Sequence, residues 1–162
     1  MVKMSIGFTE HDHGSCIAES VASVEAECAA KGLQLTAARR RVLEYLLAEH
    51  RALGAYDILD KLRKDGLGSQ PPVAYRALDF LIANGFAHRI EHLNAFVACT
   101  HPGQAHDPAF LICKECDAVA ETQIEPVKSD LDETARDAGF RLDRAVVEAE
   151  GLCPKCQLDD PK

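Results

Sequence analysis

The sequence predicts an α+β protein made of two small domains, a mainly helical one followed by one that mixes strands and helix. Three observations lead to this expectation. Apolar residues recur at helical spacing as far as Asn84-Gly85 and alternate as in strands after it. A stretch over 100–108 that is rich in Pro, Gly and His is typical of a linker. Two Cys-x2-Cys pairs then follow, and the chain of 162 residues has room for one domain or two small ones.

Three helices are expected before residue 66. The first covers 16–31 and ends at Gly32, which can adopt the left-handed conformation that closes many helices. Thr36 is a natural N-cap for the second, AARRRVLEYLLAEH, because its hydroxyl can accept a backbone N–H. The third covers 55–65, and its apolar positions face one side.

A fourth helix and a hairpin complete the first domain. The fourth helix spans about 71–84, with Pro71 and Pro72 in the first turn, where proline is tolerated. The segments FAHRIEH and AFVAC then predict two short antiparallel strands. Helices followed by a hairpin are the order of a winged helix-turn-helix domain. We therefore expect that domain over 1–92, with its wing extending to residue 99, and a hinge over 93–108.

The second domain is expected over 109–162. AFLIC and AVAETQI are typical of strands, PVKSDLDETARDAG of an amphipathic helix, and RAVVEAEGLC of a returning strand. A unit of this size buries too little apolar surface to be stable without a partner or a cross-link.

The cysteine pairs supply a candidate cross-link. Each pair places two thiolates on one tight turn, and two such turns make a closed four-thiolate zinc site, which is structural and not catalytic. The ligands are Cys113, Cys116, Cys153 and Cys156. The alternative is a pair of unrelated turns or a thioredoxin-like redox motif, but a redox motif requires one such pair and not two.

A second metal site is suggested by residues around the hinge. One sulfur, two imidazoles and one carboxylate suit zinc better than iron or manganese. The residues are His88, Cys99, His106 and Glu121. Spacing alone leaves another explanation open, since a histidine on a wing can contact phosphate and a cysteine ending a strand can belong to the core. His11, His13 and His101 leave the existence of a third site open as well.

Charge is distributed unevenly along the chain. The total is −8, but residues 31–92 contain ten Lys and Arg against seven acidic residues, a net of +3, and are the only positive block. Tyr75 and Arg76 lie in the first turns of the fourth helix, the end of a recognition helix that enters the major groove. Arg39 lies on an earlier helix, where a contact to the DNA backbone is expected.

Other features exclude some classes of protein. No run of about 18 apolar residues is present, so we expect no membrane association. The N-terminal residues do not form a signal peptide, which predicts a cytoplasmic protein with reduced cysteines. No nucleophile–base arrangement or phosphate-binding loop stands out, so an enzyme is not expected.

Several of these segments together resemble the ferric uptake regulator superfamily, most of all its zinc uptake regulator branch. They are LTAARRRVLEYL, AYDILDKL, PPVAYRALDFLIANGFAHRIE, AFVAC, FLICKECDAV and EGLCPKC, which occur in this order. The resemblance runs from about residue 20 to residue 157. The resemblance implies a zinc-dependent repressor that binds an AT-rich inverted repeat as a homodimer and controls zinc-uptake genes. Whether two dimers share one operator is left open.

The resemblance also implies roles for particular residues. The four knuckle cysteines match the family's structural zinc site, and His88, Cys99, His106 and Glu121 match the regulatory zinc site, giving two zinc ions per protomer. Tyr56 and Arg76 match positions that contact DNA. The remaining alternatives are another metal or peroxide sensor of the superfamily, such as a nickel sensor, or a thiol-based redox protein.

Two departures from the family pattern affect these expectations. The family usually has Thr-Val before the Tyr-Arg pair, whereas this sequence has Val73-Ala74, so a hydroxyl near the DNA backbone is missing. The histidine cluster of iron and peroxide sensors is reduced to His101 and His106, which argues against an iron sensor.

Overall fold

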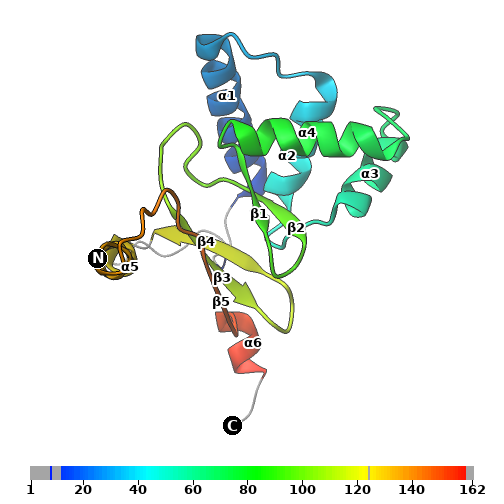
Figure 1. Ribbon diagram of the computed structural model, residues 1–162. Helices are drawn as coiled ribbons and strands as arrows, with labels where there is room; N and C mark the ends of the chain where they lie inside the picture. The colour runs from blue at the N-terminus through cyan, green and yellow to red at the C-terminus, as the bar shows by residue number, and fades with distance from the viewer. Residues whose placement is uncertain (1–7, 9–11, 124, 160–162) are drawn as a thin grey trace. The chain divides into compact units, whose positions relative to one another are not determined.

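The structure is a computed structural model that describes residue 8, residues 12–123 and residues 125–159. These residues form two compact units, one drawn from Thr9–Gln104 and the other from Ala105–Lys162 together with Phe8. The first is mainly helical and the second mixes strands and helix, so the predicted α+β class is confirmed (Figure 1). No helix in the described parts of the chain is long and apolar enough to span a membrane.

Four helices form most of the first unit: α1 (His13–Lys31), α2 (Ala37–Ala48), α3 (Ala55–Lys64) and α4 (Pro71–Ala83). The predicted caps are present: Gly32 is left-handed with φ 66°, and the Thr36 hydroxyl accepts the Arg39 N–H. Helix α1 begins three residues earlier than predicted, because the Asp12 carboxylate accepts the N–H of Gly14. Local sequence therefore sets these helix ends.

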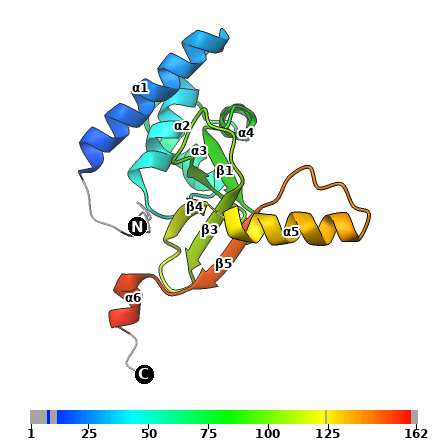
Figure 2. The ribbon, with the colours of Figure 1, turned by 90° about the vertical axis from the view of Figure 1, so that its left-hand side faces the viewer.

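The core of this unit lies where α2, α3 and α4 meet. Helix α4 lies across α2 and meets α3, and α1 runs beside α2 (Figures 1 and 2). Their facing side chains are almost completely buried, among them Leu43, Ile58, Leu62, Leu78 and Leu81. Burial of each such side chain contributes roughly 1.5–3 kcal/mol. This packing fixes which face of α4 remains at the surface.

The hairpin is shorter than the sequence suggests. Strand β1 (Ala87–Ile90) pairs antiparallel with β2 (Ala95–Ala98), and Asn94 turns the chain with φ 47°. The segment before α3 joins the hairpin, because Leu53 and Phe96 exchange two backbone hydrogen bonds of 2.8–2.9 Å. Helices α1–α4 with this attached hairpin make up the predicted winged helix-turn-helix fold.

The second unit is a three-stranded sheet with two helices. Its elements are β3 (Pro108–Cys113), β4 (Val119–Gln123), α5 (Glu125–Asp137), β5 (Val147–Gly151) and α6 (Pro154–Leu158). The strand order is β4-β3-β5, with β4 antiparallel and β5 parallel to β3. Helix α5 lies in the connection that parallel pairing requires. Helix α6 was not expected, because five residues are too few to show a helical period.

Candidate functional site

The two cysteine pairs lie together because β3 and β5 run in parallel and end at the same edge of the sheet. Cys113 is the last residue of β3 and is paired in register with Gly151, two residues before Cys153. The N–H of Lys114 donates to the carbonyl oxygen of Gly151 at 2.9 Å, which ties the first cysteine turn to the end of β5. The thirty-six residues between the two pairs form β4, α5, β5 and their connecting loops.

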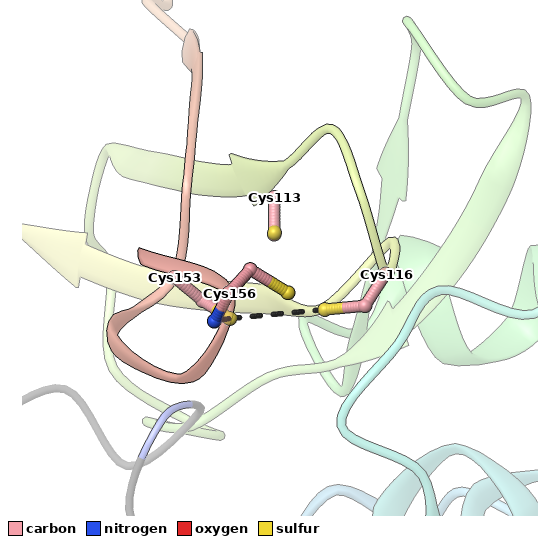
Figure 3. A group of neighbouring side chains, drawn as sticks. All are labelled: Cys113, Cys116, Cys153 and Cys156. Carbon is pink, nitrogen blue, oxygen red and sulfur yellow. Dashed lines mark hydrogen bonds between the residues drawn. The ribbon is translucent and has the colours of Figure 1, made fainter. Parts of the chain in front are cut away.

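Each pair is shaped by a short local motif. In the first, the Asp117 N–H donates to the Cys113 carbonyl oxygen at 2.9 Å, and Asp117 is left-handed with φ 57°. In the second, Cys153 is the N-cap of α6, and its Sγ accepts the N–H of Cys156 at 3.5 Å. The turns point all four sulfur atoms at a common centre (Figure 3).

The distances between these sulfur atoms match tetrahedral zinc coordination. Zinc–sulfur bonds of about 2.3 Å place two thiolates about 3.8 Å apart at the corners of a tetrahedron. The Sγ atoms of Cys116 and Cys153 are 3.8 Å apart, and all four lie within 4.8 Å of one another. Four sulfur donors complete a tetrahedral coordination sphere, so this cluster fits a closed site for a soft divalent cation.

Within the cluster the pKa of Cys113 and the pKa of Cys156 are shifted in opposite directions. Burial alone would raise the pKa of the Cys113 thiol, but backbone N–H groups of Cys153 and Cys116 lower it to about 6. The pKa of Cys156 is raised, chiefly by its side-chain hydrogen bonds with Cys153 and Cys116. The Cys113 thiolate therefore forms readily, whereas the raised pKa of Cys156 keeps that thiol protonated. A bound dication would favour its thiolate form.

The residues expected to hold a second metal occur as two pairs, one in each unit. In the first unit His88 lies on β1 and Cys99 directly follows β2, and their ligand atoms are within 4.8 Å of each other. The Cys99 N–H donates to the carbonyl oxygen of Phe86 at 3.0 Å, which fixes this corner of the hairpin. Hairpin register brings together these two residues, which are eleven positions apart in the sequence.

The second pair belongs to the sheet unit. His106 precedes β3, and its Nε2 lies 2.7 Å from Oε1 of Glu121 on β4. The neighbouring Asp107 forms an ion pair with Lys128 of α5, which holds the segment before β3. An imidazole and a carboxylate at this distance can both serve as zinc ligands.

The additional histidines show no comparable grouping. His101 is hydrogen-bonded to the hydroxyl of Thr100 through Nδ1 at 2.9 Å. His13 is the first residue of α1, and its side chain is outside the described part of the structure, as is the whole of His11. Among the described residues His101 belongs to no group of three or more potential metal ligands.

The expected DNA-contacting residues lie at the surface of the helix-turn-helix. Tyr56, in the first turn of α3, is 70% exposed, and Tyr75 of α4 is 44% exposed. Arg76 is exposed on α4 and forms no ion pair or hydrogen bond with any described residue. Its guanidinium donors are therefore available to an external acceptor.

Arg39 has a different environment. Its guanidinium carbon lies 3.9 Å from the centre of the Phe80 ring, and its Nη1 donates to the carbonyl oxygen of Gln34 at 2.6 Å. Its expected contact with the DNA backbone stays a prediction. Helix α2 and helix α4 are linked through this side chain.

The structure also shows a polar cluster that sequence reasoning did not identify. The Tyr45 hydroxyl donates to Oδ2 of Asp65 at 2.5 Å, and Nε of Arg41 donates to the same oxygen at 2.6 Å. The cluster ties α2 to the C-cap of α3. Tyr45 stands within an apolar helical stripe, so its position predicted burial but not a partner twenty residues away.

The two positions that depart from the family pattern both face the protein. Ala74 is 1% exposed and belongs to the core. Val73 packs on the loop before α4, where a Cβ atom added to Gly68 would lie only 2.7 Å from the Val73 Cγ1. The side chains that replace Thr-Val thus contribute to packing at the start of α4.

Comparison with known proteins places these features in a family. Residues 30–149 match the profile of the ferric uptake regulator family. The chain is 40% identical over 139 residues to the zinc uptake regulation proteins of Escherichia coli (strain K12) and Shigella flexneri, covering 85% of this chain and 81% of each relative.

Solved structures agree with the sequence comparison. A zinc uptake regulator complexed with zinc and DNA is 39% identical and has a TM-score of 0.84, over 88% of this chain and 96% of that one. The crystal structure of holo XcZur is 42% identical and has a TM-score of 0.79, over 86% of this chain and 98% of that one. This chain, with its winged helix-turn-helix and its four-cysteine cluster, belongs to the ferric uptake regulator family.

Proposed function

We propose that this protein is a zinc-responsive transcriptional repressor that binds an AT-rich inverted repeat as a homodimer and controls zinc-uptake genes. The observation that carries the proposal is that one chain combines an exposed Arg76 on α4, without a polar partner among the described residues, with a cluster of four cysteines that could hold a metal ion. Relatives at about 40% identity support it, since they are zinc uptake regulators and one was solved with zinc and DNA.

The four-cysteine cluster is proposed as the structural zinc site. Bound zinc would supply a positive charge that allows all four thiols to ionise, and a cross-link between the ends of β3 and β5. Cys113 and Cys116 would hold the β3–β4 turn, and Cys153 and Cys156 the start of α6. A sheet of three short strands gains folding free energy from such a site.

A second zinc ion is proposed for His88, Cys99, His106 and Glu121, which brings the expected content to two per protomer. Each unit contributes two of these ligands, so binding one ion would restrict the arrangement of the units. Zinc would then favour the conformation that fits the operator to the extent that it binds that conformation more tightly. The thiolate of Cys99 favours zinc over the metals that iron sensors and peroxide sensors bind.

DNA recognition is assigned to the surface of α3 and α4. Arg76 can donate two hydrogen bonds to guanine O6 and N7 in the major groove, and Tyr75 can reach a phosphate or a thymine methyl group. Tyr56, in the first turn of α3, is proposed to contact the DNA beside them. Arg39, expected from the sequence to contact phosphate, is treated separately below.

A homodimer is proposed because an inverted repeat presents the same half-site twice. The sheet unit supports this, since large apolar side chains are exposed on it at Leu111, Leu131, Phe140 and Val146. Apolar side chains exposed on a small unit lose contact with water when two copies associate, which supports a dimer through this unit. Binding of a second dimer to the same operator would follow only if the repeat is extended.

The proposal assigns no catalytic role to the thiols, since a closed four-thiolate site has no open position for a substrate. It also implies a cytoplasmic location, where cysteines remain reduced and DNA is accessible. The rival assignments, another metal sensor of the family or a redox protein, predict a different metal content or none.

The test combines metal analysis with DNA binding. Purified protein is analysed by mass spectrometry for zinc per protomer, and fluorescence anisotropy follows binding to duplexes selected from a random pool at saturating zinc. We expect two zinc ions, an inverted repeat among selected duplexes, and weaker binding after chelation. In Cys113→Ser the sheet unit should lose structure and dimers, whereas Cys16→Ser, a cysteine outside both groups, should behave as wild type. Zinc-independent binding, or an iron-dependent response, would contradict the proposal.

A further inference from the structure

The run Arg39-Arg40-Arg41 is the densest positive stretch of the helix-turn-helix unit, yet its charges are engaged within the protein. Arg40 forms ion pairs with the partly exposed Glu25 of α1 and the partly buried Glu44 of α2. Arg41 pairs with Glu44 and with Asp65. Each of these two guanidinium groups therefore already has two carboxylate partners, which offset its charge toward a phosphate.

Arg39 is engaged in another way, through a ring and a carbonyl. Its guanidinium lies 3.9 Å from the Phe80 ring centre, well within the distance at which a cation is attracted to an aromatic face. Its Nη1 bond to the carbonyl oxygen of Gln34, at 2.6 Å, fixes the plane of the group. The side chain is half-buried, so its head is held between the start of α2 and the body of α4.

Phe80 connects this contact to the DNA-facing residues. It lies one turn of α4 beyond Arg76, so the two residues occupy the same side of a rigid helix. On its other side Phe80 packs against Phe86 at the start of the hairpin, with ring centres 6.4 Å apart. The carbonyl oxygen of Phe80 also accepts the Asn84 side-chain amide at 2.8 Å. Phe80 thus contacts Arg39 of α2 and Phe86 beside the hairpin from a position on the same helix as Arg76.

We propose that Arg39 is a positioning residue, which sets the orientation of recognition helix α4 through Phe80, and that it does not bind phosphate. The inference rests on the proposed DNA-binding function. A small displacement of α4 would change how Arg76 meets a base edge. Arg39 would therefore contribute to operator specificity without contacting a base. Arginine suits this role because its planar group can stack on a ring and donate sideways at the same time.

The two roles for Arg39 predict different salt dependences. A phosphate contact contributes about 0.9 to the slope of log affinity against log salt, and its removal lowers the slope by about one per protomer. Loss of a positioning contact weakens binding to the selected duplex but leaves the slope, and the affinity for a shuffled duplex, unchanged.

The experiment measures zinc-loaded full-length wild type, Arg39→Gln, Phe80→Leu and the double variant on both duplexes at several salt concentrations. Arg40→Gln is the matched control, since it removes the same charge from the neighbouring position, whose described ion-pair partners lie on α1 and α2. We expect Arg39→Gln and Phe80→Leu each to weaken binding to the selected duplex roughly tenfold. The double variant should bind the selected duplex at most about twofold more weakly than either single variant, because both changes break the same contact. Tyrosine fluorescence confirms that each variant is folded under the assay conditions.

Two results would overturn the inference. One is a slope for Arg39→Gln reduced by about two per dimer relative to Arg40→Gln, and the other is a Phe80→Leu variant that binds the selected duplex as wild type does. If Arg39→Gln proves unfolded, the same comparison is made with Phe80→Leu and Arg39→Lys. The lysine keeps the charge but has no planar group to stack on the ring. Failure of wild type to bind any duplex in zinc would instead refute the proposed function.

Discussion

Replacing Tyr45 by Phe removes one oxygen atom from the interior of the helix-turn-helix unit and leaves the ring in place. Tyr45 is 8% exposed, and its hydroxyl donates to Oδ2 of Asp65 at 2.5 Å. A hydrogen bond to a charged acceptor contributes about 1.5–3 kcal/mol. We expect a loss near the lower end, about 1.5 kcal/mol, because Arg41 still pairs with Asp65 and the carboxylate still reaches water.

The sequence offers a selective assay for this loss. The chain has three tyrosines, Tyr45, Tyr56 and Tyr75, and no tryptophan, and all three lie in the helix-turn-helix unit. Tyrosine fluorescence in urea therefore reports on that unit alone. With a urea dependence of about 1.5 kcal/mol per molar, the midpoint should fall by about 1 M. Tyr56→Phe is the control, since it removes one fluorophore that is 70% exposed.

The same bond gives a pH dependence. Burial, together with the bond to the Asp65 carboxylate, raises the pKa of Tyr45 to about 12 from an ordinary value near 10. Because the folded-state value is the higher one, the stabilisation is fully present below about pH 10 and is lost between about pH 10 and 12. The stability difference between wild type and Tyr45→Phe should be constant at neutral pH and shrink across this window. Equal urea midpoints for Tyr45→Phe and Tyr56→Phe would refute the reasoning.

Three further changes have distinct expected outcomes. Arg76→Ala should weaken operator binding about a hundredfold at fixed salt, since a bidentate base contact is worth about 1–3 kcal/mol in each protomer, while zinc content stays unchanged; unaltered affinity would mean that the recognition surface is misassigned. Cys99→Ser should give a folded dimer that lacks about one zinc per protomer by mass spectrometry and no longer tightens on DNA as zinc rises; a core role predicts normal zinc content instead. Gly68→Ala should lower the free energy of unfolding by about 1–3 kcal/mol in urea, because its Cβ would meet Val73 at 2.7 Å; adding Val73→Ala should recover part of the loss, and no recovery would place the strain elsewhere.

Local patterns in the sequence determined where helices end, which face of a helix is buried and where the hairpin forms. Thr36 and Gly32 mark helix ends because capping depends on groups within a few residues. The apolar stripe of α3 predicted its buried face, and the change of period after Gly85 predicted the hairpin. Both cysteine pairs were identifiable as candidate metal ligands because each is a contiguous motif.

The tertiary structure decided what depends on contacts between distant segments. The parallel pairing of β5 with β3 brings Cys153 to Cys113, and no local pattern states that these strands are neighbours. Tyr45 and Asp65 form their bond only because α2 packs against the end of α3. Likewise Arg39 carries a charge wherever it lies, but only the fold places that charge over the Phe80 ring. A periodic pattern specifies which side of a helix is buried, whereas the identity of the group that meets it depends on how the helices pack.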